Sequence, residues 1–363
     1  MSKTVGTCLL LSAILLTGES QAQIKADEEV VFYPTYGCRA VGDACVLRIH
    51  GCIFEPEKDS PTRAAALGAL RKALGLNREV EETAIFKERA RLFLVDSERG
   101  KHVTIRLAGK EYKLGESEPN GHFTGEVRVP EKDVLNLLES RGDTQGWLPF
   151  HAVMSEGDRR AFTGHVQWTD DTGISVISDI DDTIKISEVL DRKALLRNTF
   201  LKEFAAVPGM AEVYGRWTKD GAVFHYVSAS PWQLYKIFAE FIRKSGYPPG
   251  AFHLKEFNWR VSSFLSLFDS PEEAKRTAIE PILAAFPARR FIFVGDSGEK
   301  DPEIYGALAR RHPRQLFHIL IRNVTGEAPD AERFRAAFNG VPRERWTVFS
   351  LPSQILTGPF YEP

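Results

Sequence analysis

Three carboxylates lie within four positions in the stretch VISDIDDTIK, at Asp179, Asp181 and Asp182, directly after an apolar run. Like charges this close repel one another and raise each other's pKa, so they persist where a cation or a reaction needs them. Asp179 and Asp181 are two positions apart at a predicted strand end, so both can face one site. A backbone carbonyl beside them would complete an oxygen shell for a hard cation. The spacing therefore predicts a Mg²⁺ site.

Two structural explanations of this acidic cluster fit less well. An acidic helix cap accounts for one aspartate but not for three. A calcium-binding loop needs a glycine where Ile184 stands and a bidentate glutamate where Leu190 stands. The cluster is therefore interpreted as a reactive or metal-binding site.

Further polar residues follow other predicted strands. Ser228 ends a buried strand, where its hydroxyl can donate a hydrogen bond to an anion, although serines at strand ends commonly cap turns. Asp296 and Asp301 lie five positions apart in a glycine-containing turn, which lets the first reach the metal and the second a neighbouring group. Lys275 lies in the first turn of the helix that leads back to the Asp296 strand, so it starts at the same sheet edge. A cation there can neutralise an oxyanion.

The elements that must position these residues alternate between short apolar strands and helices. Strands are predicted at ISVIS, VFHYVS, FIFVG and FHILI, with helices at 232–246 and 271–286 between them. This alternation predicts an α/β domain over residues 171–363 with a doubly wound parallel sheet, whose ligands bind beyond the carboxyl ends of the strands. The string GDSG also surrounds the nucleophile of chymotrypsin-like proteases, but the βα pattern here excludes that class.

The N-terminal half has a different pattern of apolar and polar residues. From residue 27 to 168, apolar and polar residues alternate between turn signals, which predicts antiparallel hairpins and a β-rich N-terminal domain. Residues 61–76 interrupt the strands as one amphipathic helix that begins with proline. We expect the two domains to be joined by TDDTG at 169–173. The N-terminal half contains no constellation that suggests chemistry.

The first 22 residues predict a secretory signal peptide, with a basic start, an apolar stretch and small residues before Ala22. We therefore expect an exported protein, periplasmic or extracellular. Among the three cysteines that remain, a disulfide between Cys38 and Cys45 is expected, and Cys52 should stay reduced. The formal net charge of −2 offers no broad basic face, so nucleic acid is not an expected partner.

The ordered set SDIDDT, VSASPW, Lys275 and GDSGEKDPEIY resembles the phosphatase motifs of the haloacid dehalogenase superfamily. More narrowly, it resembles the actin-patch-associated phosphatidate phosphatase family, over roughly residues 173–324. The resemblance implies a haloacid-dehalogenase-like sheet with a cap insertion. It also implies a Mg²⁺-dependent phosphatase of lipid metabolism that cleaves phosphatidate to diacylglycerol and phosphate.

The same resemblance implies catalytic roles for the carboxylates. Asp179 would attack phosphorus and become an aspartyl phosphate, while Asp181 would protonate the leaving alcohol and later deprotonate the hydrolytic water. The metal would be held by Asp179, Asp296 and the backbone carbonyl of Asp181.

Other motif residues would bind substrate or support the site. Ser228 and Lys275 would hold the non-bridging phosphate oxygens, and Thr183 would hydrogen-bond the turn that carries the nucleophile. Asp301 would orient Lys275 or a metal-bound water.

Lipid specificity rests on FNWRVSSFLSLF at 257–268, in the place where this superfamily often inserts a cap. Its aromatic residues would either meet acyl chains or form the core of the cap, and transient contact with a membrane surface is expected in the first case. Two alternatives stay open: a phosphatase for another exported phosphomonoester, and a non-catalytic protein that binds phosphate or lipid. No protein partner is indicated.

Overall fold

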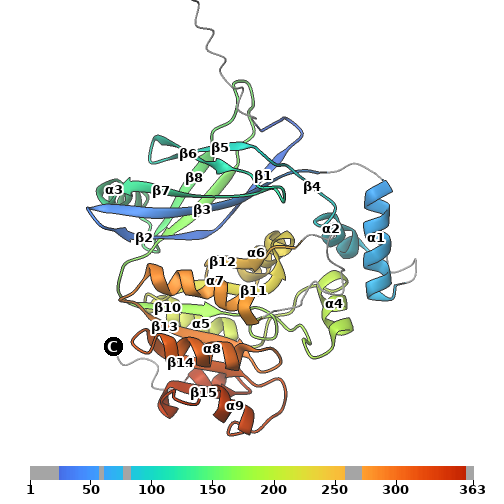
Figure 1. Ribbon diagram of the computed structural model, residues 1–363, viewed down its shortest axis with the longest axis vertical. Coiled ribbons are helices and arrows are strands. Elements are labelled where there is room, and N and C mark those ends of the chain that lie inside the picture. The colour runs from blue at the N-terminus through green and yellow to red at the C-terminus, as the bar shows by residue number, and fades with distance from the viewer. Residues whose placement is uncertain (1–23, 57–60, 77–82, 258–271, 357–363) are drawn as a thin grey trace, which may run out of the picture.

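The computed structural model describes residues 24–56, 61–76, 83–257 and 272–356, so the predicted signal peptide and all but the first residue of the 257–268 segment lie outside the described part. The strands form two sheets, one of nine strands and one of six. Figure 1 shows the nine-stranded sheet above the six-stranded sheet, with α6 and α7 beside the upper end of the six-stranded sheet, near β11 and β12.

The second half contains a parallel sheet in the order β12-β11-β10-β13-β14-β15. Its strands are β10 (Ile174–Ser178), β11 (Val223–Pro231), β12 (Ala251–Lys255), β13 (Arg290–Asp296), β14 (Leu316–Arg322) and β15 (Trp346–Phe349). The chain enters at β10, moves outward through β11 and β12, and resumes on the other side at β13. The strand order therefore reverses between β10 and β13, where a crevice forms in such sheets.

Helices cover both faces of this sheet. They are α4 (Arg192–Phe200), α5 (Met210–Lys219), α6 (Tyr235–Lys244), α7 (Glu272–Ala285), α8 (Asp301–Arg311), α9 (Glu332–Ala337) and α10 (Ser353–Leu356). Successive residues of β10 point to opposite faces: Val176 packs in one core cluster with α5 and α6, and Ile177 in another with α7 and α8. The predicted parallel α/β sheet is confirmed.

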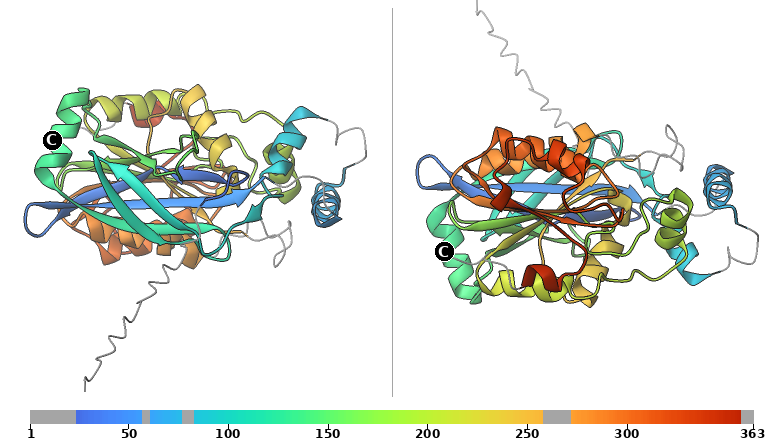
Figure 2. Two further views of the ribbon diagram at one scale, coloured as in Figure 1. Left: turned by 90° about the horizontal axis from the view of Figure 1, so that it is seen from above. Right: turned by 90° about the horizontal axis from the view of Figure 1, so that it is seen from below.

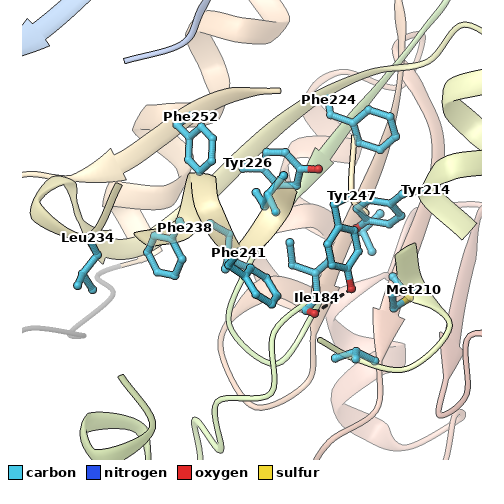
Figure 3. Close-up of a cluster of buried hydrophobic side chains, with 14 of the residues drawn as sticks. Ile184, Met210, Tyr214, Phe224, Tyr226, Leu234, Phe238, Phe241, Tyr247 and Phe252 are labelled. Atoms are coloured by element: carbon cyan, nitrogen blue, oxygen red, sulfur yellow. Dashed lines mark hydrogen bonds between the residues drawn. The ribbon is translucent and has the colours of Figure 1, made fainter. Parts of the chain in front are cut away.

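Aromatic side chains dominate the core on the α5 and α6 face. Figure 3 shows Met210 and Tyr214 of α5 near Phe224 and Tyr226 of β11, with Phe238 and Phe241 of α6 in the same cluster. In that view the Tyr247 hydroxyl donates a hydrogen bond to the carbonyl of Ile184, at 2.9 Å. Because Ile184 belongs to the loop after β10, this bond ties the loop to the core.

The first half is built around β3, which pairs with four other strands. The strands are β1 (Glu29–Tyr33), β2 (Thr35–Ala40), β3 (Ala44–Glu55), β4 (Asp96–Ser97), β5 (His102–Leu107), β6 (Lys110–Glu116), β7 (His122–Pro130), β8 (Trp147–Ala152) and β9 (Thr163–Trp168). All described pairings are antiparallel except that of β2 with β9. The strands lie where the alternating pattern predicted them, and the division into domains at 169–173 stays a prediction.

Three helices accompany these strands: α1 (Pro61–Leu74), α2 (Ala84–Arg91) and α3 (Glu131–Arg141). Helix α1 begins at the proline, as predicted. One face of the sheet buries its own apolar core, and the other packs against the second half. There Tyr33 lies on Trp232, with ring centroids 4.2 Å apart, and Tyr36 lies near Phe286, at 5.5 Å. Figure 2 shows this overlap of the two halves from above and below.

The expected disulfide between Cys38 and Cys45 was wrong. These residues are one position out of register across the β2–β3 hairpin, so their side chains point to opposite faces of the sheet. Cys38 packs toward the second half, whereas Cys45 lies in the core of the first and its Sγ accepts a hydrogen bond from Trp168 Nε1 at 3.1 Å. All three described cysteines are free and buried, as expected for Cys52.

Among the described residues, no helix has both the length and the apolar character needed to cross a bilayer.

Candidate active site

The two strands that flank the reversal of strand order each end in a predicted site residue. Asp179 follows β10 directly, and Asp296 is the last residue of β13. The backbone N–H of Asp179 donates to the carbonyl of Val294 at 2.9 Å, which holds the two strand ends side by side. Both carboxylates are buried at the carboxyl edge of the sheet, where this topology places ligands.

A third carboxylate, that of Asp301, completes a cluster with Asp179 and Asp296. Each of these residues offers an oxygen, and the three oxygens lie within 4.8 Å of one another. Asp296 Oδ1 accepts hydrogen bonds from the N–H groups of Gly298 and Glu299, whereas its buried Oδ2 has no partner among the described residues. A buried orphan oxygen beside two further carboxylates fits a hard divalent cation.

The position of Asp301 depends on the absence of a side chain at Gly295. A Cβ atom there would lie 2.2 Å from Asp301 Oδ2. Because that space is free, Oδ2 approaches the backbone and accepts a hydrogen bond from Asp296 N at 3.2 Å. The glycine therefore lets the first turn of α8 bring its carboxylate into the cluster.

Lys275 enters the same cluster from α7. Its Nζ donates to Asp179 Oδ1 at 2.9 Å and to Asp301 Oδ1, and it lies 3.4 Å from Glu299 Oε2. The side chain is only 2% exposed, so these pairs form away from water. Lys275 therefore contacts both Asp179 and Asp301, and its role in neutralising a substrate oxyanion stays a prediction.

The carboxylates on this side outnumber the single cation, and their pKa values reflect that excess. Burial raises the pKa of Asp179 well above its usual value, and Asp301 adds to the effect; burial and Asp301 likewise raise the pKa of Asp296. Burial raises the pKa of Glu299 to about 7. Although burial lowers the pKa of Lys275, Asp179 and Asp301 outweigh it and hold that pKa well above its ordinary range. A bound divalent cation would relieve the repulsion between these carboxylates.

Asp181 faces a different environment, although it is only two residues from Asp179. Its Oδ1 lies 2.7 Å from Lys185 Nζ and accepts a hydrogen bond from the Ser187 hydroxyl at 2.7 Å. Its Oδ2 accepts from Ser230 at 2.9 Å and from Ser228 at 3.3 Å. Burial alone would raise the pKa of Asp181, but Lys185 and the hydroxyl donors outweigh it and lower that pKa. The Asp181 carboxylate is thus held in its ionised form.

Asp182 has a structural role that the sequence did not suggest. Its carboxylate accepts hydrogen bonds from the backbone N–H groups of Ser187, Glu188 and Val189, at 2.8, 3.1 and 2.7 Å. Its own φ is 52°, in the left-handed region that aspartate tolerates better than most residues. The third carboxylate of the motif therefore folds the loop that carries the other two.

The structure brings together all seven site residues proposed from the sequence, although some contact other groups than expected. They are Asp179, Asp181, Thr183, Ser228, Lys275, Asp296 and Asp301. Thr183 Oγ1 donates to Asp179 Oδ2 at 2.9 Å and so supports the proposed nucleophile. Ser228 donates to Asp181 and accepts from Ser230 N at 3.0 Å, which places its hydroxyl next to Asp181. The side chain of Asp181 lies outside the carboxylate cluster, and the metal contact expected of its backbone carbonyl stays a prediction. Asp301 is the third side chain in the group with Asp179 and Asp296.

Four contacting residues were missed: Lys185, Ser187, Ser230 and Glu299. Lys185 and Ser187 alternate with isoleucines in the sequence IKIS at 184–187, and both are buried. Buried polar residues so close to the motif were the available signal, but burial itself cannot be seen in the sequence. Glu299 stood within the quoted motif without an assigned role.

The part of the chain that carries this site is similar to known proteins. Residues 174–323 match the family model described as the catalytic domain of phosphatidate phosphatase APP1. Phosphatidate phosphatase APP1 of Saccharomyces cerevisiae is 36% identical over 162 residues, which cover 44% of this chain and 27% of that protein. A Schizosaccharomyces pombe protein described as uncharacterized is 29% identical over 206 residues, which cover 55% of this chain and 32% of the relative. The matched parts thus span less than a third of either relative's own length.

A solved structure of a candidate beta-phosphoglucomutase from Thermotoga maritima covers 51% of this chain and 97% of its own, at 12% identity and a TM-score of 0.29. A TM-score this low does not establish a shared fold. The family match, by contrast, contains the complete carboxylate cluster and Lys275. Residues 174–323 are thus similar to the catalytic domain of phosphatidate phosphatase APP1.

Proposed function

We propose that this chain is a Mg²⁺-dependent phosphatidate phosphatase that forms an aspartyl-phosphate intermediate and releases diacylglycerol and phosphate. The observation that carries the proposal is the contact of Lys275 with Asp179, inside a cluster of three buried carboxylates at the switch point of the sheet. The family match supports the choice of phosphatidate, which is the substrate named for the yeast relative. We also propose a haloacid-dehalogenase-like fold for the parallel-sheet half, with a cap in the 257–268 segment.

Asp179 is the nucleophile in this proposal. One Asp179 oxygen attacks phosphorus while the bond from phosphorus to the glycerol oxygen breaks, so the phosphoryl group moves to the carboxylate. Thr183 and Lys275 fix the orientation of the Asp179 carboxylate, and Lys275 Nζ also neutralises charge on the phosphoryl oxygens.

Asp181 is the general acid and then the general base in this proposal. It gives a proton to the glycerol oxygen as that oxygen leaves, then takes a proton from the water that attacks the aspartyl phosphate, and inorganic phosphate departs. Lys185 and the hydroxyl donors favour the ionised carboxylate, which suits the second step. An anionic phosphate beside Asp181 raises its pKa, and this favours the protonated form that the first step requires.

Asp179, Asp296 and Asp301 are the side chains that would hold Mg²⁺. When bound, the cation would supply positive charge that reduces repulsion between the anionic carboxylate and the anionic phosphate. The unpartnered Oδ2 of Asp296 is the feature that supports this assignment most directly. Oxygen-only ligands favour Mg²⁺ or another hard cation over zinc.

Three further parts of the proposal rest on the sequence. Residues 1–22 act as a secretory signal, and the mature protein works in the periplasm or outside the cell. Residues 27–168 form a domain separate from the phosphatase domain at 171–363. Contact with substrate is made at a membrane surface, transiently, because the substrate is a lipid.

The proposal is tested by phosphate release from a short-chain phosphatidate and from a panel of soluble phosphomonoesters, in Mg²⁺ and in EDTA. We expect metal-dependent release that favours the lipid. Asp179→Asn should reduce turnover by about a thousandfold or more, because an amide is a poor nucleophile, while the protein stays folded. The exposed Asp330→Asn serves as the matched control and should retain wild-type turnover.

Other results would change the assignment in defined ways. Release from soluble esters alone would keep the mechanism and replace the substrate. A folded Asp179→Asn protein with normal turnover would contradict the assigned nucleophile. Phosphate binding without any release would favour a non-catalytic protein.

A further inference from the structure

A cavity of about 540 Å³ lies where the first sheet meets the second half. Its buried walls include Tyr33, Leu94 and Trp232, and Val31 and Phe54 add further apolar surface. This volume falls in the range of cavities that hold small organic ligands. The cavity is distinct from the carboxylate cluster, because none of the clustered residues lines it.

The cavity nevertheless begins close to the reacting groups. Trp232 lies only two residues beyond Ser230, whose hydroxyl donates to Asp181 Oδ2 at 2.9 Å. Two residues of extended chain span at most about 7 Å between Cα atoms. Ser230 beside Asp181 and Trp232 in the cavity wall are therefore close neighbours at the end of β11.

The lining favours an uncharged, apolar ligand segment. The Trp232 ring packs between Tyr33 and His50, with centroids 4.2 and 4.7 Å away, and His122 lies in hydrogen-bond contact with His50 at 3.0 Å. Burial lowers the pKa of His50 to about 3 and that of His122 to about 4, so this wall is neutral at physiological pH. No buried lining residue carries a formal charge.

Charged side chains lie at the exposed rim instead. Arg91 and Lys236 are exposed cations there, and Lys236 Nζ lies 3.9 Å from Glu29 Oε2. Lys236 is thus paired with a carboxylate, and the Glu256 carboxylate accepts a hydrogen bond from the lining Asn120 at 2.8 Å, so the rim carries charges of both signs. An apolar interior beneath a polar, solvated rim complements a hydrocarbon chain attached to a polar headgroup.

We propose that this cavity binds one acyl chain of the lipid substrate and so sets the chain-length preference of the phosphatase. The inference rests on the proposed function and adds to it a binding site formed jointly by the N-terminal strands and the β11–α6 connection. It gives the N-terminal half a role in substrate selection.

The test compares kcat/KM for dioctanoyl and dibutanoyl phosphatidate, each divided by the same protein's rate on p-nitrophenyl phosphate to correct for changes at the reacting centre. Each buried methylene contributes about fourfold, so the wild-type protein should prefer the longer chains by more than tenfold. Val31→Phe narrows the cavity from β1 with a residue that strands favour, and should reduce this preference several-fold.

A second cavity supplies the matched control. Ala239 of α6 lines a separate hollow of about 440 Å³, and Ala239→Leu fills that hollow with a good helix former. This variant should keep the wild-type preference. The proposal is overturned if folded Val31→Phe keeps that preference, or if Ala239→Leu loses it instead.

A binding measurement separates failure of the cavity from failure of the proposed function. Asp179→Asn is mixed with phosphatidate that carries brominated acyl chains, and quenching of tryptophan fluorescence is recorded, with Trp232→Phe to identify the quenched residue. Quenching that depends on Trp232 and is lost in Val31→Phe supports the site, even if phosphatidate is not hydrolysed. Absence of Trp232-dependent quenching in a folded protein overturns it.

Discussion

Asp179 and Asp181 are two residues apart and equally buried, yet their surroundings differ in almost every physical respect. Asp179 faces Asp296, Asp301 and the Lys275 ammonium, and burial raises its pKa against the opposing effect of Lys275, with Asp301 adding to the rise. Asp181 faces Lys185 and three hydroxyl groups, and its pKa is lowered. Around Asp179, the carboxylates thus outnumber the ammonium of Lys275. Around Asp181, the ammonium of Lys185 already balances the carboxylate.

The difference shows how a short motif can give two identical side chains different tasks. The side of Asp179 needs a cation before its carboxylates can all be ionised, so metal binding and activation of the nucleophile are linked. The side of Asp181 is complete without a metal, so its carboxylate is available to exchange protons. Removing Lys275 from the Asp179 side should therefore cause a loss of stability that Mg²⁺ can restore. Removing Lys185 from the Asp181 side should cause a loss that Mg²⁺ cannot restore.

The largest effect is expected for Lys275→Met, which removes the one ammonium that contacts Asp179 among the residues that the structure describes. Turnover should fall by about a thousandfold, because the phosphoryl oxygens lose a charged donor. In EDTA the free energy of unfolding should fall by about 4 kcal/mol, since Asp179 and Asp301 are left buried without a cation. Chemical denaturation with and without Mg²⁺ measures this, and Mg²⁺ should restore much of the loss.

The matched control is Lys219→Met, at an exposed lysine, and it should change neither the turnover nor the free energy of unfolding. A Lys275→Met protein with wild-type stability in EDTA would show that the carboxylates on this side are protonated and need no counter-charge.

A smaller and metal-independent loss is expected for Lys185→Met on the Asp181 side. Removing one member of this buried pair should cost about 3 kcal/mol of unfolding free energy at neutral pH, and Mg²⁺ should not restore it. The folded-state pKa of Asp181 is below the unfolded value, so the pair contributes above about pH 4 and its contribution is lost as pH falls further. The stability gap between wild type and variant, measured by urea denaturation, should narrow in acid. Rescue of the variant by Mg²⁺ would contradict the division into two sides.

The smallest expected effect concerns Glu299, whose pKa burial raises to about 7. Because the folded protein binds this proton more tightly than the unfolded chain, stability in EDTA should decline as pH rises from about 4.5 to about 7. The slope should be on the order of 1 kcal/mol per pH unit. Glu299→Gln removes one titrating group and should make this decline shallower in a series of denaturation curves, while Asp179 and Asp296, whose pKa values burial also raises, still contribute. An unchanged slope in the variant would assign the pH dependence to another group.

The sequence predicted the Asp179 side well because its residues obey a rule of topology. Asp179, Lys275 and Asp296 each lie at a strand end or helix start on the same edge of a parallel sheet, and that edge is visible from the alternation of apolar strands and helices. Asp301 was also placed in contact with Lys275. Its grouping with Asp179 and Asp296 depends on the close approach at Gly295, which spacing alone does not reveal.

The Asp181 side was not predicted, because it depends on burial and on loop conformation. Lys185 and Ser187 turn back toward Asp181 only because the Asp182 carboxylate binds three backbone N–H groups of the same loop. The error at Cys38 and Cys45 has a related origin: the hairpin was recognised, but its register decides which face each sulfur occupies. Pairing of β2 with β9 joins residues more than a hundred positions apart and leaves no local pattern to read.

The most direct test of the account is to trap the covalent intermediate. Wild-type protein is mixed with a short-chain phosphatidate in Mg²⁺, quenched in acid within the first turnover, and digested for mass spectrometry. The account predicts one phosphoryl group on the peptide that contains Asp179, attached at that residue and absent from Asp179→Asn. Phosphoryl transfer to Asp181 or any other residue, or substrate turnover in which no intermediate forms on the protein, would contradict it.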